Sequence, residues 1–154
     1  MSTKSFGGLS QQLVLFMHDP ELALLVDRLM RRIHFGLQER APDFDRKMVG
    51  PGGGVVLMTL AEMKCTGLNA LTQRVARDKS QMTRVIRSLE EKGLVQRELS
   101  ESDARVSMVS LTPEGELVVA ELMDTVAEVI DELLAPISEG DQQALKSLLT
   151  RVVG

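Results

Sequence analysis

The segment between residues 79 and 111 constrains the fold more than any other part of the chain. Apolar residues of Lys79–Lys92 fall on one side of a predicted helix, and polar residues fall on the other. Gly93 follows, and glycine suits the left-handed position just past a helix end. Residues 94–99 and 105–111 are short, partly alternating and rich in β-branched side chains, which predicts a β-hairpin. An amphipathic helix therefore leads directly into a hairpin.

A long helix is predicted near the N-terminus, from His18 to Arg40. Asp19 suits its N-cap and Pro20 its first helical position, and leucines then recur at spacings of three and four. Pro42 is expected to end this helix. Residues 43–54 contain a proline and three consecutive glycines, a composition that predicts a loop.

Further helices complete the order of elements. Two short helices are predicted before Asp78, a long one after Thr112 and a last one after Ser138, with a short apolar arm ahead of them all. Their ranges are 55–64, 68–76, 113–135, 139–152 and, for the arm, 10–17. Three helices followed by a two-stranded hairpin form a winged helix-turn-helix. We therefore expect a mainly α protein with a small β-hairpin wing, in a single domain over 1–154.

Composition limits the class of protein. Hydrophobic residues make up 44% of the chain and charged residues 26%, which excludes a disordered, collagen-like or membrane-embedded class. No apolar run is long enough to span a membrane, and the N-terminus lacks an export signal. Cys65 is the single cysteine, so the fold does not depend on a disulfide. We expect a cytoplasmic protein with no membrane partner.

The net charge of −4 conceals a segregation of charge along the chain. Residues 72–112 carry 8 basic and 6 acidic groups, whereas residues 113–154 carry 2 and 9. A basic element can hold phosphates while a distant acidic helix supplies solubility. The overall charge therefore does not exclude a nucleic-acid partner.

The polar face of the 79–92 helix has the chemistry of a DNA-reading surface. Arginine grips guanine in a bidentate way, serine and threonine reach bases or phosphates, and Gln81 is able to pair with adenine. The backbone amides of Lys79 and Ser80 lie at the positive end of the helix, where they favour a phosphate. Taken alone, the same face is equally well explained as a solvated surface. The preceding helix, tight turn and following hairpin favour DNA binding.

The run from Leu71 to Gly115, and above all DKSQMTRVIRSLEEKGLVQRELSESDARVSMVSLTPEG, resembles the signature of the MarR family of transcription regulators. It combines a D-K-S-x-x-T-R start, an L-E-E-K-G-L-V exit, a D-x-R wing and an L-T-x-x-G opening into the next helix. Ala104 departs from the family, which usually has a second basic residue there. The glycines before Val55 depart too, since a Leu-Thr entry is more usual.

The resemblance implies a role for each matching position. Major-groove contacts fall to Ser80, Gln81, Thr83, Arg84 and Arg87. The wing residue Arg105 enters the minor groove, held by an ion pair with Asp103. An ordinary exposed hairpin pair is the alternative reading of these two wing residues.

The apolar residues of the 113–135 helix form too wide a surface for one small lobe to bury. The ends of the chain, 1–41 and 113–154, are therefore expected to be the dimerisation helices of a homodimer, with 54–112 as the DNA-binding lobe. A twofold dimer places two reading helices about 34 Å apart on double-stranded DNA, so the operator is expected to be an inverted repeat.

Members of the MarR family usually release DNA when a small molecule enters a crevice between the dimer helices and the DNA-binding lobe. Arg31, Arg32, His34 and Phe35 are candidates for lining it, although an exposed basic patch with a packed phenylalanine explains them equally well. The sequence identifies no effector.

We expect no cofactor and no metal, because His18 and His34 have no companions at ligand spacing. Cys65 is expected to be a small buried thiol rather than a redox sensor.

Two other functions remain in view. A winged-helix dimer that has lost DNA binding and acts as a protein-interaction or ligand-binding module is expected to lack basic residues on the reading helix, and this chain keeps them. An enzyme has less support, because no nucleophile and base, phosphate loop or metal set is present. The expected function is a repressor.

Overall fold

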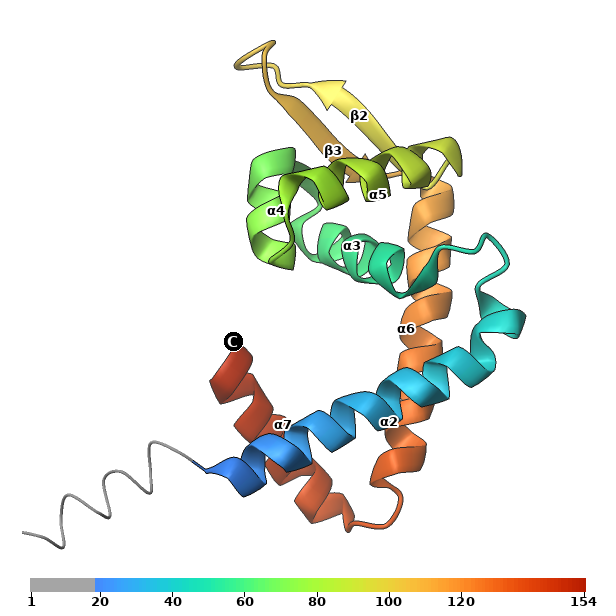
Figure 1. Cartoon of the computed structure of the whole chain (residues 1–154), viewed down its shortest axis with the longest axis vertical. Helices are drawn as coiled ribbons and strands as arrows, with labels where there is room; N and C mark the ends of the chain where they lie inside the picture. The colour runs from blue at the N-terminus through green and yellow to red at the C-terminus, as the bar shows by residue number, and fades with distance from the viewer. Residues whose placement is uncertain (1–18) are drawn as a thin grey trace, which may run out of the picture.

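In the computed structural model, which describes residues 19–154, a compact lobe stands above a frame of long helices (Figure 1). The elements in chain order are α2 (Pro20–Phe44), α3 (Gly50–Met63), β1 (Cys65–Gly67), α4 (Leu68–Val75), α5 (Lys79–Glu91), β2 (Val95–Leu99), β3 (Ser107–Leu111), α6 (Pro113–Leu134) and α7 (Glu139–Val153). The expected class, mainly α with a small hairpin wing, is confirmed. The arm expected over 10–17 and His18 lie outside the described residues.

The lobe consists of α3, α4 and α5 packed with the sheet around one apolar core. Each helix contributes fully buried side chains, and the sheet closes the core from the other side. Its largest members are Leu57, Leu60, Leu71, Met82, Ile86, Leu89 and Leu94. Burial of a leucine or isoleucine side chain stabilises a fold by about 1.5–3 kcal/mol, so this core holds α5 firmly in place.

The wing is part of a three-stranded antiparallel sheet with the order β1-β3-β2. The hairpin pairs Val95 with Leu111 and Leu99 with Ser107. The third strand, β1, pairs Thr66 with Val109 and was not predicted, because three residues are too few for an alternating pattern to be recognised.

The expectation that Cys65 is buried is wrong, since its thiol is exposed. Successive side chains of a strand point to opposite faces. In β1 this alternation turns Thr66 into the lobe and leaves Cys65 outside.

Pro42 does not end the first long helix, which continues to Phe44. A proline this close to a helix end removes only one backbone hydrogen bond. The Asp45 backbone N–H still donates to the Ala41 carbonyl at 2.8 Å and closes the last turn.

The loop predicted over 43–54 is also too long, because α3 already begins at Gly50. The carboxylate of Asp45 accepts the backbone N–H groups of Val49 and Gly50, at 2.7 and 2.8 Å, and so caps the start of α3. The glycines provide room for close packing: a Cβ on Gly53 would lie 2.6 Å from Val49 Cγ1, and one on Gly54 would lie 3.2 Å from Leu122 Cδ2. Proximity, rather than a turn, explains these glycines.

The exit of α5 meets the start of α6 at a tight backbone crossing. Gly93 has a φ of +72°, and its carbonyl accepts the Thr112 hydroxyl at 2.6 Å. Gly115 is buried against Leu94, and a Cβ on Gly115 would lie 2.0 Å from the Leu94 carbonyl oxygen. We call residues 92–94 and 112–115 the junction.

Two lysines fasten the turn between α2 and α3 to the junction. The Lys92 ammonium donates to the carbonyls of Lys47 and Met48, at 2.7 and 3.2 Å, and the Lys47 ammonium donates to the Lys92 carbonyl at 3.1 Å. Lys47 also pairs with Glu114 at the start of α6. Three segments that are distant in sequence are thus joined at one place.

Gly115→Ala is expected to lower the free energy of unfolding by at least about 2 kcal/mol, because the new methyl group overlaps a backbone carbonyl that cannot move alone. Gly140→Ala is the matched control: its Cβ would meet nothing closer than 3.9 Å, so the better helix former leaves stability unchanged or raises it by up to about 1 kcal/mol. Urea denaturation at equal protein concentration measures both. Equal midpoints for the two variants would contradict the close approach at the junction.

Asp78→Ala is expected to cost about 1 kcal/mol, because the Asp78 carboxylate accepts the Gln81 N–H at 2.9 Å and caps α5. Asp78→Asn keeps an acceptor at that position and is expected to remain within about 0.5 kcal/mol of the parent. Equilibrium unfolding distinguishes a capping role from a general effect of the charge, which both substitutions remove.

Candidate nucleic-acid interface

The outer face of α5 carries the residues predicted to read DNA. Buried Met82, Ile86 and Leu89 anchor one side of the helix in the core. The opposite side is fully open, and every predicted contact residue on it is exposed: Lys79, Ser80, Gln81, Thr83, Arg84 and Arg87. The separation of faces expected from the sequence is therefore present, on a helix that the core holds rigidly.

The exposed side chains differ in how they are engaged. The Thr83 hydroxyl donates to the Lys79 carbonyl at 2.8 Å. Arg87 Nε lies 3.3 Å from Glu91 Oε1, in an exposed pair that contributes little and is easily exchanged for another partner. Within residues 19–154, Arg84 has no carboxylate partner. Within the same residues Lys79 has none either, so Arg84 and Lys79 are both open to an external acceptor on this face.

The wing hairpin extends from the lobe away from α2 and α7 (Figure 1). Arg105 is 95% exposed on its side chain, and its Nε lies 3.8 Å from Asp103 Oδ1. The same carboxylate oxygen accepts the Arg105 backbone N–H at 3.0 Å. A long, exposed ion pair contributes little, so Asp103 acts mainly on the shape of the turn.

One ion pair between α5 and the wing was not predicted from the sequence. Arg97 Nε of β2 lies 2.8 Å from Glu90 Oε1 in the last turn of α5. Both side chains are about two-thirds buried, so the pair joins the wing to the reading helix. Neither residue stands out in the sequence, because each is one charge among many.

An apolar crevice of about 450 Å³ lies where α2, α3 and α6 meet. Its walls include Ile33, Leu37, Met58 and Val126, and Gly54 contributes at its floor. Of the four candidate effector residues, His34 alone lines it. The other three are on a different side of α2.

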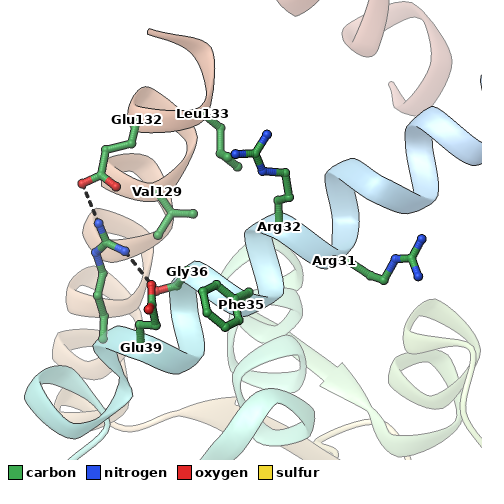
Figure 2. A pocket seen from close by; sticks show the side chains of 9 residues that line it. Arg31, Arg32, Phe35, Gly36, Glu39, Val129, Glu132 and Leu133 are labelled. Carbon is green, nitrogen blue, oxygen red and sulfur yellow. Dashed lines mark hydrogen bonds and ion pairs between the residues drawn. The ribbon is translucent and has the colours of Figure 1, made fainter. Parts of the chain in front are cut away.

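Arg31, Arg32 and Phe35 line a second hollow of about 380 Å³, formed by α2 and α6 (Figure 2). Figure 2 shows Arg31 and Arg32 pointing in different directions, with Arg32 toward Leu133 of α6. Phe35 is 60% exposed and therefore is not packed against the other described residues. The sequence could not separate the two hollows, since adjacent residues of a helix point to different sides.

A fixed ion pair closes one end of this second hollow. Arg40 donates to the Gly36 carbonyl at 3.0 Å and to Glu132 Oε1 at 2.5 Å. The hydrogen bond with Glu132 raises the pKa of Arg40 above its usual value. Among residues 19–154, no group of three His, Cys, Asp or Glu side chains is placed to hold a metal.

The two ends of the described chain carry apolar side chains that no other described element covers. In α2 the only buried residue is Gly36, and α7 has no buried residue at all. The exposed large apolar side chains are Leu22, Leu24, Leu25, Val26, Leu29, Met30 and Phe35 in α2, and Leu148, Leu149, Val152 and Val153 in α7. None of the described helices has the length and apolar character needed to cross a membrane.

Comparison of sequences identifies one family. Residues 53–107, from the first turn of α3 to the start of β3, match the model of the MarR family. A candidate transcriptional regulatory protein for the hcr operon of Thauera aromatica is 30% identical over 104 residues, or 68% of this chain. The chain spans 63% of that relative's length.

Solved structures share the fold over most of its length. The reduced form of MarR from Escherichia coli superposes with a TM-score of 0.74 at 21% identity, over 89% of this chain and 99% of that one. Bordetella bronchiseptica BpsR, described with its regulation of DNA binding by 6-hydroxynicotinic acid, gives 0.70 at 22% identity over 87% and 99%. The family-model match therefore identifies residues 53–107 as a MarR-family domain, and the solved structures show that most of the chain shares the fold of these proteins.

Proposed function

We propose that this protein is a sequence-specific regulator of transcription that binds double-stranded DNA as a homodimer. The observation that carries the proposal is the exposed face of α5, on which Arg84 has no carboxylate partner within the described chain while the opposite face is fixed in the core. A rigid helix with a free guanidinium and small hydroxyls suits the major groove. A module that had lost DNA binding would not need this face.

Each site residue takes a role that its position supports. Arg84 and Arg87 grip base edges, with Arg87 exchanging Glu91 for DNA, while Ser80, Gln81 and Thr83 supply shorter hydrogen bonds. The first-turn amides of Lys79 and Ser80 hold a phosphate. Arg105 of the wing enters the minor groove, where a narrow groove attracts arginine.

The homodimer is built from both ends of the chain, residues 1–41 and 113–154, and the segment 54–112 is the DNA-binding lobe. The uncovered apolar faces of α2 and α7 support this, because a 15-residue helix without a buried residue is not stable on its own. A twofold axis through these helices presents two α5 helices to an inverted repeat.

The protein acts as a repressor that a small molecule releases from DNA. BpsR, a protein of the same fold, provides a precedent for the regulation of DNA binding by a small molecule. The crevice between α2, α3 and α6 supports the proposal, since it touches both the helical frame and the DNA-binding lobe. A ligand shifts the spacing of the two lobes only if it binds one arrangement more tightly than the other. The relatives named above are regulators, and we assign no catalytic activity.

Arg84→Ala is expected to weaken binding to the DNA upstream of the protein's own gene by roughly 5- to 150-fold, and to relax the base preference at one position of each half-site. Fluorescence anisotropy at two salt concentrations measures both effects. Arg46→Ala, at an exposed position of the turn between α2 and α3, removes the same charge outside α5, the wing and the proposed dimer segments, and is expected to leave affinity unchanged. If the two variants bind equally, the reading face is not on α5.

Leu149→Asp is expected to raise the dimer dissociation constant by at least tenfold, because it places a charge in the apolar face of α7. Analytical ultracentrifugation over a dilution series measures the change. Leu99→Asp, at a leucine of the wing strand β2 that is more exposed than Leu149, is expected to leave the dimer intact. A parent protein that is monomeric at micromolar concentration would exclude this dimer.

A further inference from the structure

The chemistry of the crevice between α2, α3 and α6 restricts what it can bind. Among residues 19–154, no lysine and no arginine lines it, and Asp45 is the one carboxylate in the lining. Both oxygens of that carboxylate accept backbone N–H groups, from Val49 and Gly50, so Asp45 is held in place. A second anion here would face repulsion and find no cation.

The rest of the lining is apolar. Leucine, isoleucine, valine, methionine and phenylalanine side chains of three helices provide most of it. His34 and Gln38 are exposed at the rim, where each offers a hydrogen bond. A cavity of about 450 Å³ is within the range of roughly 300–1,000 Å³ that is usual for small-molecule sites.

The arginines of α2 lie elsewhere. Arg31 pairs with Asp27 at 2.5 Å, and Arg40 pairs with Glu132 on the α6 side of the helix. Both line the second hollow rather than the crevice. Arg28 and Arg32, the other arginines of α2, do not line the crevice either, so no arginine of this helix contributes to its lining.

We infer that the effector of this protein is an uncharged, largely aromatic or aliphatic molecule that binds in the crevice with at most one or two polar groups directed at His34 and Gln38. Carboxylates and other anions are discriminated against, because burying an ion without a partner costs far more than burying a neutral ring of the same size. That the bound molecule is an effector rests on the proposed function. The selectivity is a property of the cavity itself.

Two dyes with the same ring skeleton test this selectivity at pH 8. N-phenyl-1-naphthylamine is neutral, and 8-anilino-1-naphthalenesulfonate adds one sulfonate to it. We expect saturable fluorescence enhancement with the neutral dye, and at least tenfold weaker binding of the sulfonate. Ala41→Trp and Val55→Trp, two independent substitutions that fill the crevice, are each expected to remove this binding. Circular dichroism identifies a variant that fails to fold.

A gain-of-function variant supplies the converse test. Gln38→Arg places a cation at the rim and is expected to reduce the ratio of the affinities for the two dyes at least threefold. Gln38→Leu adds no cation and is not expected to reduce this ratio. Equal affinity of the parent for both dyes, no saturable binding, or neutral-dye binding that survives in both tryptophan variants would each overturn the inference.

The DNA titration is run on the same samples, so that the two proposals fail separately. Intact DNA binding with equal dye affinities would overturn the ligand class and leave the regulator standing. No DNA binding together with the expected dye selectivity would overturn the regulator and leave the ligand class standing.

Discussion

The close approach of two backbones at the junction is the constraint on which the rest of the structure depends. Gly115 leaves no space for a side chain beside the Leu94 carbonyl, so the start of α6 is fixed directly against the exit of α5. The Thr112 hydroxyl and the two lysines add hydrogen bonds at the same place. The orientation of α5 is thereby tied to the long helix α6, which leads to the region proposed for dimerisation, without a flexible linker between them.

This connection gives the crevice its significance. The turn that carries Asp45 and Val49 borders the crevice on one side, and through Lys47 and Met48 it is hydrogen-bonded to Lys92 at the end of α5. Packed protein interiors respond to an inserted molecule by shifting as units rather than by deforming locally. A ligand that moves this turn is therefore in a position to move α5, which is what the proposed release from DNA requires.

The helix α2 has an apolar side and a charged side, and the two sides line different hollows. One side provides an apolar wall for the crevice, whereas another carries arginines that are paired with Asp27 and Glu132. Its N-terminal half exposes leucines that a partner subunit would cover. The overall charge of the chain, which is negative, describes none of these local surfaces.

The sequence by itself determined the local elements and the faces of α5. Asp78, Thr112 and Ser138 cap their helices as expected, and the spacing of Met82, Ile86 and Leu89 alone decided which side of α5 is buried. These features depend on neighbours within one or two helical turns, which the chain order specifies completely.

Only the tertiary structure decided the features that depend on distant residues. It extended α3 into the glycines, because Asp45, Val49 and Leu122 surround them, and it added β1, which exists only through pairing with β3. It also divided four neighbouring residues of α2 between two hollows, leaving one beside the crevice. Close approach, strand pairing and the lining of a cavity are made by segments far apart in the chain, and no local pattern records which segments will meet.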